Sequence, residues 1–182
     1  LFRLNDMLSA MDPAWISRFQ EAMKDYLLTR EPPEGWITDG EADWLIAQVQ
    51  NDAHIPSLDE LDLLIELLRK ADGAPEKLAR FTVEAVSDRI ISDGIASLNM
   101  VERMRYALYA GAGHGGLWVS QFEAGLLFKT NDAIAEADNA PTWNDLFARA
   151  VGNHLMARAH PDPQTVEGAL ARESWLQDSS SS

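Results

Sequence analysis

The stretch GWITDGEADWL, residues 35–45, occurs again in altered form as GLWVSQFEAGLL, residues 116–127. Superposing the two stretches on their tryptophans pairs six identical or similar residues: Trp36 with Trp118, Ile37 with Val119, Thr38 with Ser120, Glu41 with Glu123, Ala42 with Ala124, and Leu45 with Leu127. A match of this kind indicates that a piece of the chain has been duplicated. The duplication gives more information about the architecture of the protein than about its activity.

The duplication extends beyond this first pair. WISRFQEAMKDYLL (residues 15–28) aligns with WNDLFARAVGNHLM (143–156), and LFRLND (1–6) aligns with LFKTND (127–132). A looser third copy is EAVSDRII, residues 84–91. Ordered matches at nearly constant spacing predict a repeated supersecondary element.

The periodicity within these segments is helical. The pattern F-x-x-A-x-x-(D/N)-x-L-L places apolar residues three to five positions apart, as on one stripe of an α-helix. Three segments begin with S/T-x-x-E, the capping-box signature of a helix start, at Thr38, Ser57 and Ser120. Together these signals predict helices over residues 39–51, 58–70, 76–91, 99–109, 121–130, 143–157 and 164–176.

The sequence therefore predicts an all-α fold of tandem helix-hairpin repeats packed as one helical bundle or array. We expect one domain over residues 1–178, made of a partial unit 1–34, a unit 35–116 and a unit 117–178, and a flexible tail at 179–182. An element like WVSQFEAGL precedes LFKTND, but none precedes LFRLND. We therefore expect the chain to be a piece of a longer protein.

Composition narrows the classes of partner. The 182 residues carry a formal net charge of −14, which opposes binding to nucleic acid or to an anionic membrane and favours cations or basic partners. Without cysteine the chain has no disulfide, thiol nucleophile or cysteine-ligated zinc. No apolar run is long enough to predict membrane insertion, and the expected location is the cytoplasm.

The common catalytic motifs are absent from the sequence. It contains no H-E-x-x-H or G-x-S-x-G, and GAGHGG (residues 111–116) follows a predicted helix where a phosphate loop would follow a strand. The four histidines, which we interpret as surface residues, are His54, His114, His154 and His160. We therefore expect no enzyme activity; a metal-dependent hydrolase or oxygenase would need the fold to gather distant histidines and carboxylates.

Acidic residues at the predicted helix ends allow two interpretations. Glu41 and Glu123 occupy the third position of capping boxes, which makes them helix caps, and the other acids form a solvated face. Alternatively some of them bind a divalent cation of the calcium type, which requires about six to eight converging oxygens. No stretch fits the EF-hand loop pattern.

The tryptophans also have two interpretations. Trp15 with Trp143, and Trp36 with Trp118, occupy equivalent places in the duplication, which favours positions in the hydrophobic core. We expect Trp36 and Trp118 to clamp the corner of a hairpin. The alternative is an aromatic recognition surface.

Units of the form D-G-x-I-x-x-x-E followed by a helix resemble the TerB family of tellurite-resistance-associated proteins. The stretches that carry the resemblance are GWITDGEADWL, ISDGIASLNMVERM and GLWVSQFEAGLLF, within residues 35–156. The third lacks the Asp-Gly pair. The resemblance implies an all-helical fold, no demonstrated enzyme activity, and a context of divalent cations or membrane-stress complexes. The acidic residues that match its loop, and hence the candidate metal ligands, are Asp39, Glu41, Asp93 and Glu102.

Two functions follow as hypotheses. The first is a non-enzymatic helical repeat module that binds another protein or a second copy of itself, needs no cofactor, and presents an extended face of stacked hairpins. The alternative is a TerB-like stress protein that binds or senses a divalent cation through its acidic loops.

Overall fold

The computed structural model describes residues 13–50, 55–111 and 118–159. Within these ranges the chain forms seven α-helices, one π-helix and no β-strand: α2 (Pro13–Asp25), η1 (Tyr26–Arg30), α3 (Asp39–Gln50), α4 (Leu58–Lys70), α5 (Glu76–Asp93), α6 (Leu98–Gly111), α7 (Gln121–Ala133) and α8 (Pro141–Ala159). The predicted all-α fold is confirmed. The helix expected over 164–176 lies outside the described residues, and the repeat organisation stays a prediction.

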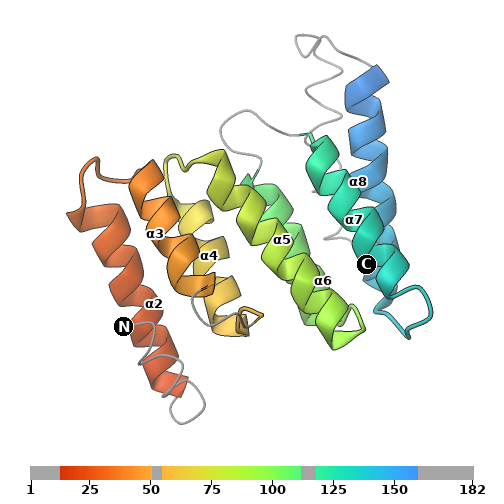
Figure 1. Ribbon diagram of the computed structural model, residues 1–182, viewed down its shortest axis with the longest axis horizontal. Helices are drawn as coiled ribbons and strands as arrows, with labels where there is room; N and C mark the ends of the chain where they lie inside the picture. The colour runs from red at the N-terminus through yellow and green to blue at the C-terminus, as the bar shows by residue number, and fades with distance from the viewer. Residues whose placement is uncertain (1–12, 51–54, 112–117, 160–182) are drawn as a thin grey trace, which may run out of the picture.

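The helices pack in two layers (Figure 1). One layer runs from α2 through α4 and α6 to α8, each helix in contact with the next in this order, and the other runs from α3 through α5 to α7. Contacts of α5 with α4 and α6, and of α7 with α8, join the layers. Of the helices described, none combines the length and the hydropathy that crossing a membrane requires.

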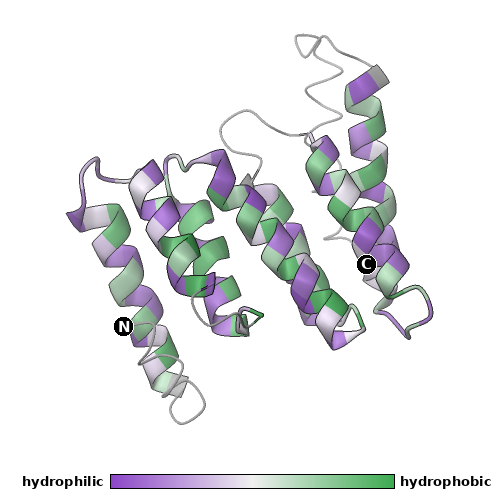
Figure 2. Ribbon diagram, viewed as in Figure 1, coloured by the Kyte–Doolittle hydropathy of each residue, from purple (hydrophilic) through white to green (hydrophobic). Residues whose placement is uncertain are grey.

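Two hydrophobic clusters form the core. The first lies among α5, α6, α7 and α8, and the second among α2, η1, α3 and the beginning of α5. Helix α4 belongs to both, because Leu61 and Ile65 face the first cluster while Leu64 and Leu67 face the second. Apolar and polar segments alternate along most helices in Figure 2, as expected for helices with one buried stripe.

The predicted capping boxes are present at all three helix starts. In α4, Ser57 Oγ accepts a hydrogen bond from the backbone N–H of Glu60, whose carboxylate accepts one from the backbone N–H of Ser57. Ser120 and Glu123 make the same pair of bonds at the start of α7. Each box satisfies two backbone donors that a helix start leaves without partners, which explains why the starts of α3, α4 and α7 could be predicted.

Helix α2 continues beyond its last regular turn in an unusual form. The regular part of α2 ends at Asp25, and the chain continues as the π-helix η1 through Arg30 before Glu31 becomes extended. A π-helix is rare and occurs frequently at functional sites. It widens the turn in which Tyr26 lies.

The corner before α3 is joined to the segment that follows α4. The backbone N–H of Ile37 donates to the carbonyl of Gly73 at 2.9 Å, and the N–H of Asp72 donates to the carbonyl of Gly35 at 2.7 Å. The Trp36 ring lies directly over Gly73, where an added Cβ would come within 2.3 Å of the ring. Glycine at this position is therefore required for the close approach.

The tryptophans do not all lie in the core. Trp143 is fully buried, whereas Trp15 and Trp118 are half-buried. The expectation of a core position is wrong for Trp36, which is 52% exposed. Its ring covers Gly73 with one face, and the corner leaves the rest of the ring in solvent.

Candidate functional site

The four predicted metal ligands lie on three different helices. Asp39 and Glu41 stand in the first turn of α3, Asp93 ends α5, and Glu102 lies within α6. In the parts of the chain that the structure describes, no three His, Cys, Asp or Glu residues gather closely enough to hold a metal ion. The fold therefore brings Asp39 and Glu41 into one helix turn but does not bring the four residues together.

Three of these acids make ion pairs. Asp39 lies 3.0 Å from the Nζ of Lys77, Asp93 pairs with Arg89, and Glu102 pairs with Arg105. Lys77 bridges Asp39 to Asp43, and the hydrogen bonds that its ammonium group donates to Asp43 and then to Asp39 raise the pKa of Lys77. Asp39, Asp93 and Glu102 therefore belong to surface ion pairs.

One of the four histidines lies in the described residues. The Nδ1 of His154 on α8 is 2.8 Å from the carbonyl oxygen of Val119, so this ring helps to attach α8 to the start of α7. His54, His114 and His160 lie outside the described residues.

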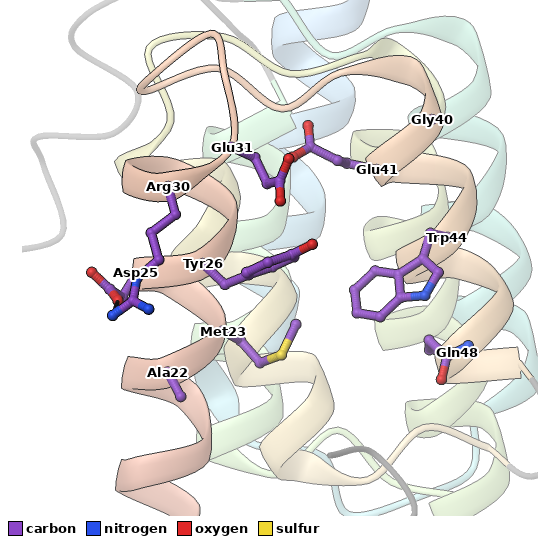
Figure 3. Close-up of a pocket in the computed structure, with 10 residues that line it drawn as sticks. All are labelled: Ala22, Met23, Asp25, Tyr26, Arg30, Glu31, Gly40, Glu41, Trp44 and Gln48. Atoms are coloured by element: carbon purple, nitrogen blue, oxygen red, sulfur yellow. Dashed lines mark ion pairs between the residues drawn. The ribbon is translucent and has the colours of Figure 1, made fainter.

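A cavity of about 630 Å³ lies between α2 with η1 on one side and α3 on the other (Figure 3). We call it the η1–α3 pocket, and the residues that line it include Met23, Tyr26, Glu31, Glu41, Trp44 and Gln48. Its volume lies in the range of about 300–1,000 Å³ that is usual for ligand sites.

Two aromatic rings stand on opposite sides of the pocket. Tyr26, the first residue of η1, points towards α3, and Trp44 of α3 points back towards it (Figure 3). The two residues are 44% and 41% exposed, large fractions for aromatic side chains. Met23, itself almost fully buried in the second core cluster, lines the pocket below them. The pocket thus has apolar walls that solvent reaches.

The polar end of the pocket is formed by Glu31 and Glu41 (Figure 3). The predicted capping role of Glu41 is confirmed, because its Oε2 accepts hydrogen bonds from both the backbone N–H and the hydroxyl of Thr38, each at 2.7 Å. Its other oxygen, Oε1, is buried without a hydrogen-bond partner. Such a buried acceptor is costly and calls for an explanation.

The hydroxyl of Tyr26 is under the influence of both carboxylates. A hydrogen bond to Glu31 and the negative charge of that residue raise the pKa of Tyr26, with smaller contributions from burial and from the charge of Glu41. Tyr26 therefore stays neutral and keeps its donor directed at Glu31. This bond links η1 to the extended residues that follow it.

Arg30 and Asp25 complete the border of the pocket. Arg30 Nη2 lies 2.7 Å from Asp25 Oδ2, and Figure 3 shows the pair on the side away from Trp44. The guanidinium of Arg30 thus does not lie between the two rings. The pocket is lined by three carboxylates and one guanidinium, so it has an excess of negative charge; the carboxylates are those of Asp25, Glu31 and Glu41.

The sequence pattern did not predict Tyr26, Glu31 or Trp44 as site residues. A clue was present in the sequence, because the aligned segments place Leu126 opposite Trp44 and His154 opposite Tyr26. An aromatic residue that is present in only one of two aligned segments is less readily explained as part of a common core than an aromatic residue present in both. Such departures between copies were the available clue.

No protein-family model, curated protein or solved structure matches this chain. The resemblance to the TerB family therefore stays a prediction from the sequence.

Proposed function

We propose that this protein is a non-catalytic helical module that binds a partner protein at the end formed by α2, η1 and α3. The η1–α3 pocket carries the proposal, because it joins two exposed aromatic rings to a group of carboxylates. Tyrosine and tryptophan are, with arginine, the residues enriched among the energetic centres of protein interfaces.

The charge of the chain supports a basic partner. A net charge of −14 attracts positively charged proteins over distances of about a Debye length and accelerates their association. The carboxylates of Glu31 and Glu41 then meet the partner at the pocket itself. Long-range attraction and the local site thus favour the same sign of charge.

Selection from a random peptide library displayed on phage tests this function. The proposal expects enriched peptides that contain basic residues and that bind the full chain with a defined Kd by calorimetry. Trp44→Ala should weaken that binding at least about tenfold, as for an interface centre. The matched control is Tyr109→Ala, which removes an exposed aromatic ring of α6 outside the pocket. No enriched peptide, or equal losses in the two variants, would overturn the proposal.

The alternative, a divalent-cation sensor, has a separate test. Thermal melts of the chelator-treated chain with calcium, magnesium and zinc would show a higher Tm if an ion binds the folded state. That rise should disappear in a variant with Asp39→Ala and Glu41→Ala, which removes the two predicted ligands that share the first turn of α3. No shift with any of the three ions would reject the alternative.

A further inference from the structure

We infer that the η1–α3 pocket binds a cationic nitrogen on a short apolar chain, namely the ammonium or guanidinium group of a lysine or arginine side chain. The inference deepens the proposed function, and it rests on that function only for the identity of the molecule that carries the cation. It rests on the two rings, on the charge at the polar end, and on one buried oxygen.

The rings supply the first part of the argument. A cation is attracted to the face of an aromatic ring when it lies within about 6 Å of the ring centre. Tyr26 and Trp44 approach the pocket from facing elements, so a cation in the pocket can lie over the face of either ring (Figure 3). Met23 lines the same space with an apolar side chain, which suits the methylene groups of lysine or arginine.

The charges supply the second part. Glu31 and Glu41 stand at one end of the pocket, while the positive charge of Arg30 is paired with Asp25 on its far side. An anionic ligand would meet carboxylates at the polar end, and a neutral apolar ligand would leave their negative charges without a countercharge. A cationic nitrogen satisfies both the rings and the carboxylates.

The buried oxygen supplies the third part. Three capping glutamates occur in the described residues, at positions 41, 60 and 123, and Glu41 is the one whose carboxylate retains a buried oxygen without a hydrogen bond. Capping explains Oε2 of Glu41 but does not explain Oε1. A donor at the polar end of the pocket would supply this missing partner once the Glu41 carboxylate turns Oε1 towards the cavity.

The experiment is a titration of the full chain followed by two-dimensional ¹⁵N–¹H NMR. Two probes represent a peptide side chain: Nα-acetyl-lysine amide and Nα-acetyl-arginine amide. The probe for a free amine is 1,4-diaminobutane, and Nα-acetyl-norleucine amide is the uncharged control. The indole N–H signal of Trp44 is assigned with a Trp44→Phe variant. We expect saturable shifts of this signal and of the amides of η1 with the cations, at about millimolar Kd for isolated amino acids, and none with norleucine.

Two matched variants separate binding from folding. Glu41→Gln removes the charge but keeps a side chain that can complete a capping box, and Glu123→Gln makes the same change in the equivalent cap of α7, outside the pocket. We expect Glu41→Gln to weaken cation binding at least about tenfold and Glu123→Gln to leave it unchanged. Equal losses in both variants, saturating shifts with norleucine, or no shift with any cation would overturn the inference.

The outcomes also distinguish this inference from the proposed function. Binding of 1,4-diaminobutane in preference to both capped amino acids would support the cation site and identify a free amine as its ligand. Peptides that bind the chain without moving the Trp44 signal would support protein binding and reject the pocket as a cation site. Cation binding without any selected peptide would support the cation site and reject protein binding.

Discussion

The two ends of the molecule are built from aligned sequence and make different contacts. At one end, where α8 follows α7, the Oδ1 of Asn153 accepts a hydrogen bond of 2.7 Å from the backbone N–H of Val119. His154 contacts the carbonyl oxygen of the same residue. At the other end α2 precedes α3, and the aligned residues are Asp25 and Tyr26. These two residues face a pocket instead of attaching the helices to each other.

The exchange of an amide for a carboxylate accounts for part of this difference. Asn153 is fully buried, as a neutral group with a hydrogen-bond partner can be. The Asp25 side chain is 46% exposed and paired with Arg30, because burying an ionised carboxylate without such a partner would be costly. Ile37, the counterpart of Val119, bonds to Gly73 instead. The space that is closed at the α8 end is therefore open beside η1.

The largest predicted effect concerns the aligned tryptophans. Trp143→Ala should lower the free energy of unfolding by about 3–5 kcal/mol, because it empties a fully buried position and breaks the bond from its indole N–H to Asn131. Trp15→Ala should cost about 1–2 kcal/mol, since Trp15 is half-buried. Urea denaturation of both variants measures the difference. Equal costs would mean that the two ends are packed alike.

A second prediction compares Asn153 with Asp25. Asn153→Ala should cost about 1–3 kcal/mol, because it leaves the buried N–H of Val119 without a partner. Asp25→Ala should change the free energy of unfolding by less than about 0.5 kcal/mol, as usual for an exposed ion pair. Chemical denaturation at pH 7 checks both values. A larger loss in Asp25→Ala would show that the end beside η1 depends on this pair.

Only part of the fold and of the candidate site could be predicted from the sequence. The starts of α3, α4 and α7 were predicted correctly because a capping box depends on four consecutive residues. The pocket was not predicted, since it depends on the distance between α2 and α3 and on the π-helical turn at Tyr26. The exposure of Trp36 likewise depends on its contact with Gly73, 37 positions along the chain.

The third prediction concerns the caps that the two ends share. Ser120→Ala and Thr38→Ala should each lower the free energy of unfolding by about 1 kcal/mol, because each removes the acceptor for a backbone N–H at the start of a helix. Thermal melts of the two variants test this equality. A much smaller loss in Thr38→Ala would indicate that α3 is loosely held beside the pocket.

The smallest predicted effect depends on pH. Burial, and next the negative charge of Asp62, raise the pKa of Asp59, which lies in the first turn of α4. A carboxyl with a raised pKa opposes folding once it is ionised, so stability falls as the pH rises through the folded-state pKa. Asp59→Asn should therefore be more stable at pH 7 by a few tenths of a kcal/mol, about the size expected for a partly screened charge.

The pH series of melts for Asp59→Asn supplies its own control. The advantage should disappear below the ordinary aspartate value of 3.8, where the carboxyl is protonated in both states. Asp138→Asn, an exposed change between α7 and α8, should give no such pH-dependent gain. A destabilised Asp59→Asn variant at pH 7 would contradict the prediction.

Helix α4 has a consequence for the cooperativity of unfolding. Its leucines belong to both hydrophobic clusters, so neither end can lose its core without uncovering one side of this helix. Arrays whose units contact only their neighbours can unfold one unit at a time. Here the shared helix couples the two ends, and the amide protons of α4 should exchange with solvent most slowly in the chain, at a rate set by global unfolding.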